Sequence, residues 1–240
     1  MRKAVALLVL VALTAPMGIP TPAPAGARRQ VIGRSVQDRP LRLIERGRSS
    51  AHRKVMVVGC IHGNECAGRA IVRTLREMPA PDDLHLLLVP ALNPDGQFAG
   101  TRQNARGVDL NRNFSHRWEP IGEPWDTYHS GPRPFSEPES RAARDLIAQR
   151  RPDITIWYHQ AMELVVKAGR KRFRHIQRRY ARSVGLPLRD LGFIPGTAIG
   201  WQNRNYPGHL AFVVELPAGA MSERSARRHA RAVLEIGWAW

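Results

Sequence analysis

Four nearly continuous apolar segments, separated by stretches of helical periodicity, limit the fold of this 240-residue chain more than any other feature. The apolar segments cover residues 55–59, 84–89, 154–158 and 211–216, and the helical stretches cover residues 67–78, 139–149, 172–184 and 223 to about 236. Apolar runs without polar alternation are typical of strands buried on both faces. Because these strands alternate with helices, we predict an α/β fold: a single-domain, three-layer sandwich with a mixed, mostly parallel sheet flanked by helices.

The N-terminus has the pattern of an export signal. Arg2 and Lys3 precede an apolar run at 4–15, and Ala23 and Ala25 supply the small residues that a signal peptidase requires. An uncleaved membrane anchor is the alternative, but prolines interrupt the run too early for a span. The sequence therefore predicts a signal peptide at 1–25, a linker at 26–34 and one folded domain at 35–240. The mature protein is expected outside the cytoplasm, secreted or in a periplasmic or cell-wall space, with no membrane span.

The chain is strongly basic, with a formal charge of +17, and only four of its 37 basic residues are lysine. Such a surface attracts polyanions such as nucleic acid, anionic lipid or an anionic cell wall. A general bias toward arginine is the alternative, because arginine occurs along the whole chain. The basic cluster from Arg170 to Arg182 is predicted to form one face of a helix, but it matches no base-reading motif. We therefore expect no nucleic-acid partner and allow for association with an anionic cell-wall polymer.

Two predicted strands end at residues that bind metal ions. His62 and Glu65 lie on the turn after the first strand, and His159 follows the third. A catalytic zinc ion takes three such nitrogen and oxygen ligands and keeps one position open for water. A His-x-x-Glu pair alone is weak, but Gly63 permits a tight turn, and a third ligand at another strand end strengthens the interpretation. We predict one Zn²⁺ per chain.

Two further segments carry candidate polar groups. Asn111 and Arg112 are suited to hold a carboxylate through charge-assisted hydrogen bonds, and Asp109 is suited to accept the free N–H of a metal-bound histidine. A solvated polar loop is the alternative for this segment. Glu215 interrupts the fourth apolar strand, where a carboxylate is costly unless it is paired with an arginine or has a function.

The two cysteines, Cys60 and Cys66, bracket the proposed ligands of the first turn. In an oxidising compartment an even pair favours a disulfide. Two free thiols, or one thiol bound to zinc, are the competing interpretations.

Taken together, these motifs resemble the zinc carboxypeptidase family of metallopeptidases. The resemblance rests on the sequences HGNE at 62–65, NPDG at 93–96, DLNRNF at 109–114, the strand-end His159, and VVEL at 213–216. The segment SEPE at 136–139 and the stretch from Gly196 to Trp201 are most similar to the murein peptide amidase branch. Enzymes of that branch cleave the bond between γ-D-glutamate and diaminopimelate in bacterial cell-wall peptides.

The resemblance implies a role for each candidate residue. It implies that His62, Glu65 and His159 bind zinc, in a catalytic domain at residues 35–240. The remaining roles are general base and proton donor for Glu215, polarisation of the scissile carbonyl for Arg102, and binding of the substrate carboxylate for Asn111 and Arg112. The expected function is zinc-dependent hydrolysis of an amide bond next to a free-carboxylate residue of a small peptide, in bacterial murein.

One departure and two alternatives bear on this expectation. Family carboxypeptidases carry a tyrosine on a mobile loop, whereas residues 191–195 contain none, and Tyr206 is a possible substitute. N-acyl amino acid deacylases, such as the succinylglutamate desuccinylase and aspartoacylase group, share HGNE and DLNR, although NPDG and SEPE favour a peptidase. A non-catalytic cell-wall-binding protein is the alternative of another class.

Overall fold

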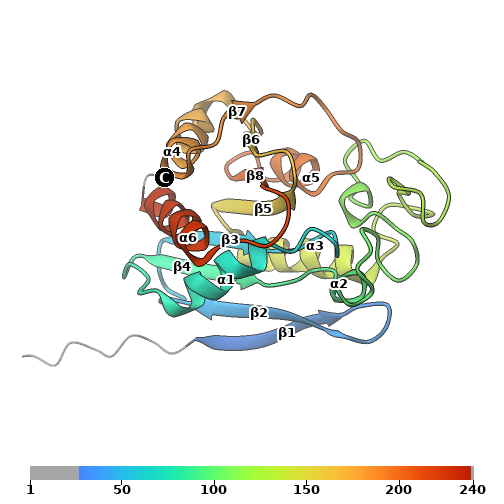
Figure 1. The fold of residues 1–240 in the computed structure, drawn as a ribbon, viewed down its shortest axis with the longest axis horizontal. Helices are drawn as coiled ribbons and strands as arrows, with labels where there is room; N and C mark the ends of the chain where they lie inside the picture. Colours follow the sequence, from blue (N-terminus) through green and yellow to red (C-terminus); the bar gives the residue numbers. More distant parts are fainter. Residues whose placement is uncertain (1–26, 239–240) are drawn as a thin grey trace, which may run out of the picture.

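An eight-stranded mixed sheet forms the middle layer of the computed structural model, which describes residues 27–238 (Figure 1). The strand order is β1–β2–β4–β3–β5–β8–β6–β7. The strands are β1 (Arg28–Arg34), β2 (Pro40–Arg46), β3 (Arg53–Val58), β4 (Leu84–Val89), β5 (Ile154–Gln160), β6 (Leu164–Val166), β7 (Leu188–Arg189) and β8 (Leu210–Leu216). The central strands β4, β3, β5 and β8 are parallel, so their carboxyl ends share one edge of the sheet.

Helices cover both faces of this sheet (Figure 1). On one face lie α1 (Gly68–Glu77), α4 (Arg174–Val184) and α6 (Glu223–Trp238), and on the other lie α3 (Pro138–Arg150) and α5 (Ala198–Asn205). The short helix α2 (Pro94–Ala99) and the 3-10 turns η1 (Leu110–Arg112) and η2 (Lys171–Phe173) lie in the connections. The predicted α/β sandwich is therefore confirmed.

Alternation along the strands divides the core in two. In β3, Val55 and Val57 pack beneath α1 and α6, whereas Met56 and Val58 pack on the α3 side. Because successive side chains of a strand point to opposite faces, every central strand contributes apolar side chains to both hydrophobic cores. This explains why these strands read as continuous apolar runs.

The expected linker at 26–34 is wrong. Residues Arg28–Arg34 form β1, which pairs antiparallel with β2 at the edge of the sheet. Most of β1 is exposed and polar, so it has no apolar pattern that would mark a strand. The predicted signal peptide lies outside the described residues. Within the described part of the chain, no helix is long and apolar enough to cross a membrane.

A buried polar chain links three elements beneath the α1–α4–α6 face. The hydroxyl groups of Tyr158 and Tyr180 lie 2.7 Å apart, and the Tyr180 hydroxyl lies 2.8 Å from Nδ1 of His229. All three side chains are buried. Burial, together with the charge of Arg228, lowers the pKa of His229 to about 4, so its imidazole is neutral in the folded protein.

This shift predicts an acid-dependent loss of stability. His229 binds a proton near pH 6.5 when unfolded but only near pH 4 when folded, so the stability that it contributes is present above pH 6.5 and is lost as the pH falls toward 4. We expect His229→Gln, which keeps an acceptor for Tyr180 but does not titrate, to remove this component. The difference in unfolding free energy between wild type and variant, measured in urea on metal-free protein, should change by on the order of 2–3 kcal/mol between pH 7 and pH 4. A pH-independent difference would contradict the assignment.

Candidate metal centre and its cleft

The three predicted zinc ligands meet at the carboxyl edge of the central strands. His62 and Glu65 lie on the turn after β3, and His159 lies near the end of β5. His159 is also the direct partner of Glu215 in the parallel pairing of β5 with β8. Both side chains point to the α3–α5 face. His159 lies two residues after Trp157 and Glu215 two residues after Val213, both of which pack on that face, and alternate residues of a strand point the same way.

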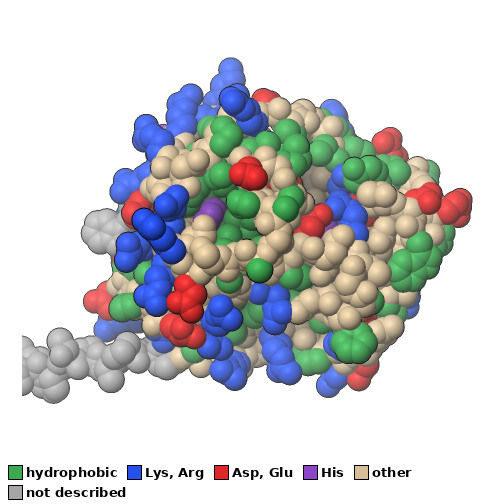
Figure 2. Space-filling view, viewed as in Figure 1, with side chains coloured by type: hydrophobic (Ala, Val, Ile, Leu, Met, Phe, Trp, Pro, Cys, Tyr) green, Lys and Arg blue, Asp and Glu red, His purple; other side chains and the backbone are tan. Residues whose placement is uncertain are grey.

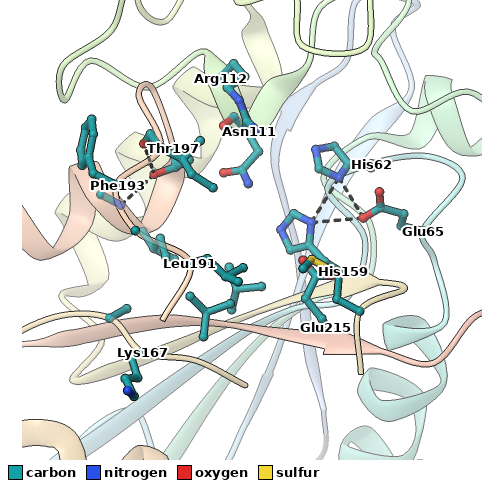
Figure 3. A pocket seen from close by; sticks show the side chains of 18 of the residues that line it. His62, Glu65, Asn111, Arg112, His159, Lys167, Leu191, Phe193, Thr197 and Glu215 are labelled. Carbon is teal, nitrogen blue, oxygen red and sulfur yellow. Dashed lines mark hydrogen bonds and ion pairs between the residues drawn. The ribbon is translucent and has the colours of Figure 1, made fainter. Parts of the chain in front are cut away.

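The donor atoms of these residues fit one zinc ion (Figure 3). Nδ1 of His62 lies 2.9 Å from Oε2 of Glu65 and 3.2 Å from Nδ1 of His159, which itself lies 3.2 Å from Oε2 of Glu65. Donors bonded at ~2.0–2.1 Å to a tetrahedral zinc lie ~3.3 Å apart. Burial lowers the pKa of His159 to about 4, so its imidazole keeps a lone pair at neutral pH.

Asp109 and Arg102 form hydrogen bonds that orient the metal ligands. Oδ1 of Asp109, which is fully buried, lies 2.9 Å from Nε2 of His62 and thereby leaves Nδ1 for the metal. Burial lowers the pKa of His62, but the charge and hydrogen bond of Asp109 outweigh it and raise the pKa overall. The Arg102 guanidinium donates to Oδ2 of Asp109 and to Oε1 of Glu65.

Arg102 therefore lies beside the metal ligands, not free in the cleft. It lines the cleft and retains donors, because each terminal nitrogen of a guanidinium carries two N–H groups and these contacts use one of each. Its predicted contact with a scissile carbonyl stays a prediction.

Two local constraints shape the ligand turn. Cys60 and Cys66 form a disulfide that closes the segment containing His62 and Glu65, so the favoured interpretation of the cysteines is confirmed. A Cβ atom on Gly63 would lie 1.9 Å from the backbone of Gly96, which excludes any larger residue. The glycine of the NPDG motif is required by another contact, because a Cβ atom on Gly96 would lie 2.4 Å from the carbonyl oxygen of Gln103.

Asn111 and Arg112 line the cleft opposite the ligands (Figure 3). The Asn111 side-chain oxygen accepts a hydrogen bond of 3.0 Å from the backbone N–H of Ala198, which turns its amide nitrogen toward the cleft. Burial lowers the pKa of Arg112 although Asp109 opposes the shift, and its guanidinium lies 4.9 Å from the ring of Tyr128. Both residues can therefore donate to a substrate carboxylate.

Glu215 has the environment expected of a proton-transfer group. Its Oε2 is buried and, among the described residues, has no hydrogen-bond partner. Burial and the neighbouring negative charge of Glu65 raise its pKa to about 7. A structural ion pair with an arginine, the alternative drawn from the sequence, is not formed within residues 27–238.

The cleft in front of these groups has a volume of about 430 Å³, and its lining includes a tyrosine that the sequence did not indicate. Tyr128 lines the cleft, with its ring 5.6 Å from the Arg102 guanidinium. Tyr206 does not line it and packs against Trp201, so its suggested substitution for the loop tyrosine is wrong. Tyr128 lies in a loop with no periodic pattern, and only the folded structure brings it to the cleft.

Comparison with known proteins identifies the family. A family model described as zinc carboxypeptidase matches residues 21–185, more than half of the chain. The chain belongs to the zinc carboxypeptidase family. Zn²⁺ is the cofactor that family membership implies, as the ligand pattern predicted.

Individual members of the zinc carboxypeptidase family are similar over part of their length. Murein peptide amidase A of Escherichia coli K12 is 32% identical over 152 residues, which cover 55% of this chain and 59% of that protein. Carboxypeptidase B of Astacus astacus is 26% identical over 163 residues, which cover 55% of this chain and 54% of that protein. The chain thus spans little more than half the length of these relatives.

Solved structures extend the likeness to nearly the whole chain. Murein-tripeptide amidase from Escherichia coli O157 superposes with a TM-score of 0.70 at 25% identity, over 89% of this chain and 92% of that one. Carboxypeptidase A from Helicoverpa armigera superposes with a TM-score of 0.75 over 89% of this chain and 68% of that one. At 17% identity, the second likeness concerns the fold alone.

The Asp109 contact yields a test of the metal centre. Asp109→Asn keeps the shape of the side chain but removes the charge that orients His62 and holds Arg102, so zinc affinity should fall by about 10–100-fold. Competition with a chromogenic chelator measures the affinity. Asp145→Asn, an exposed change on α3, serves as the matched control. Equal affinities for the two variants would contradict the role of Asp109.

Proposed function

We propose that this protein is a zinc peptidase that hydrolyses the amide bond next to a free-carboxylate residue, in murein peptides with γ-D-glutamyl-diaminopimelate. The observation that carries the proposal is the convergence of three metal donors, the buried Glu215 and the carboxylate-binding pair Asn111 and Arg112 on one cleft. The likeness to murein peptide amidases supports the choice of peptide.

Glu215 performs the proton transfers in this proposal. Zn²⁺ bound by His62, Glu65 and His159 would supply an activated water and polarise the scissile carbonyl. Oε2 of Glu215 has no competing partner among the described residues, so it accepts the proton of the attacking water. It then delivers that proton to the leaving nitrogen as the C–N bond breaks. A pKa of about 7 suits both transfers at neutral pH.

Arginine and asparagine side chains orient the peptide. Arg112 and the amide nitrogen of Asn111 donate to the free carboxylate of the residue on the leaving-amine side. The remaining N–H groups of Arg102 are directed to the carbonyl oxygen as negative charge develops on it. Fixing the carboxylate thus places the scissile bond beside the metal donors and Glu215.

Replacement of Glu215 by Gln tests the mechanism and the reaction together. The variant should bind one zinc per chain but lose hydrolysis of the tripeptide L-Ala-γ-D-Glu-meso-diaminopimelate, with kcat reduced by at least ~10³-fold. Zinc is quantified by metal analysis after dialysis, and hydrolysis by mass spectrometry. Glu77→Gln, an exposed change at the end of α1, is the control. Retained turnover by Glu215→Gln would remove this residue from the mechanism.

The same assay distinguishes the alternatives. Preferential hydrolysis of N-succinylglutamate would indicate a deacylase. Binding of purified murein without bound zinc or hydrolysis would indicate the non-catalytic wall-binding protein.

We also propose that residues 1–25 direct export and that the protein associates with an anionic cell-wall polymer. Support comes from the surface of α4 and α6, where basic side chains gather along the edge seen at the left of Figure 2. The exposed arginines of this surface, here called the α4–α6 arginine surface, are Arg178, Arg179, Arg182, Arg224, Arg227, Arg228 and Arg231. Within residues 27–238 none of them forms an ion pair.

The arginine surface makes a salt-dependent prediction. Replacing Arg178, Arg182 and Arg227 by Gln should weaken binding to poly(glycerol phosphate) and lower the slope of log affinity against log salt by about 2. Co-sedimentation with the polymer at several salt concentrations measures this. The control variant carries the same change at three dispersed, exposed arginines: Arg48, Arg73 and Arg133. An equal effect of both variants would indicate that binding depends on net charge and not on this surface. Stronger binding to DNA than to the polymer would contradict the choice of partner.

A further inference from the structure

The cleft continues beyond the metal centre to a lysine at its far end. Lys167 directly follows β6, and its backbone N–H donates a hydrogen bond of 2.7 Å to the carbonyl of Arg189 in β7. Figure 3 shows it at the end of the cleft opposite His62 and Glu65, with the ammonium group turned away from them. Within residues 27–238, Lys167 forms no ion pair.

Apolar walls separate this lysine from the reaction centre. Val166, Ile199 and Val213 line the cleft together with Leu191 and Phe193 from the loop before α5, and Figure 3 shows Leu191 on the side of the cleft between Lys167 and Asn111. Such a wall accepts an aliphatic chain and offers it no hydrogen-bonding group. A side chain in this part of the cleft therefore packs through methylene groups and places its end near Lys167.

The charges along the cleft are unevenly distributed. Arg112 and Lys167 lie at separate places along the cleft (Figure 3), whereas both carboxylates of the lining, Glu65 and Glu215, belong to the reaction centre. The far end thus offers a cation and no anion among the residues that line it. It suits a carboxylate and repels a side chain that ends in an ammonium or guanidinium group alone.

We propose that Lys167 is a specificity residue that binds a second carboxylate, at the end of the side chain of the residue whose amine leaves. The inference rests on the proposed function, because the first carboxylate is the one bound by Asn111 and Arg112. Diaminopimelate meets all three requirements: an α-carboxylate for Arg112, a methylene chain for the apolar wall and a terminal carboxylate for Lys167. Lysine has the same chain but ends in an ammonium group.

Four peptides separate the contributions of chain and charge. The substrates are L-Ala-γ-D-Glu-X, in which X is meso-diaminopimelate, L-2-aminopimelate, L-lysine or L-norleucine. Aminopimelate keeps the terminal carboxylate without the ammonium group, and norleucine keeps only an aliphatic chain. Because Lys167 is solvent-exposed, we expect its contact to favour the two carboxylate substrates over norleucine by about 5- to 20-fold in kcat/KM, with lysine the poorest.

Two variants of Lys167 test its part in this preference. Lys167→Met keeps the aliphatic length and should reduce the diaminopimelate-to-norleucine ratio of kcat/KM to about 1. Lys167→Glu should invert the order, so that the lysine peptide becomes better than the aminopimelate peptide. Lys171→Met, a change of another exposed lysine that does not line the cleft, should leave every ratio unchanged. Zinc content and melting temperature verify that each variant is folded.

The outcomes separate this inference from the function on which it rests. Hydrolysis of the peptides with the same ratios in wild type and Lys167→Met overturns the role of Lys167 and leaves the peptidase intact. Absence of hydrolysis of all four peptides by the zinc-loaded wild type overturns the proposed function and, with it, the inference. A diaminopimelate-to-norleucine ratio that falls to about 1 in Lys167→Met but is kept in Lys171→Met supports the role of Lys167.

Discussion

The parallel pairing of β5 with β8 is the constraint on which the site depends. This register sets His159 directly opposite Glu215 and turns both side chains to the same face of the sheet. A shift by one residue would send one of them into the apolar core beneath α4 and α6. Because β3 pairs with β5 on the other side, the turn with His62 and Glu65 reaches the same edge. The site is therefore positioned by backbone hydrogen bonds in the centre of the sheet.

Around this edge, residues that do not line the cleft hold residues that do. The Asn93 side chain accepts from the backbone N–H of Gly96 and donates to the carbonyls of Arg102 and Gln103, which anchors the segment that carries the Arg102 guanidinium. Gly196, in the left-handed conformation with φ +65°, fits against the carbonyl oxygen of Arg112, where a Cβ atom would lie 2.2 Å away. These contacts explain why the NPDG motif and the glycine before α5 accompany the ligands, although neither supplies one.

The sequence predicted the fold and the metal ligands because both follow from local patterns. Continuous apolar runs indicated the central strands, and polar residues at their ends indicated the edge where they meet. The outer strands gave no such signal: β1 is polar and exposed, and β6 and β7 have three and two residues. Tyr128 and Lys167 could not be assigned either, because their positions in the cleft depend on which loops meet in space. The orientation of Arg102 toward Glu65 and Asp109 is likewise a tertiary property.

The excess positive charge of the chain does not simply accumulate at the site. The Arg102 guanidinium is balanced by two buried or half-buried carboxylates, Glu65 and Asp109. Among the residues that line the cleft, this leaves Arg112 and Lys167 as the cations without an ion-pair partner, one at each end of an apolar wall. Glu215 lies beside the metal donors, where burial and the charge of Glu65 raise its pKa to about 7. A ligand with two carboxylates separated by methylene groups thus matches the cleft in both charge and polarity, whereas no arginine of the α4–α6 arginine surface lines the cleft.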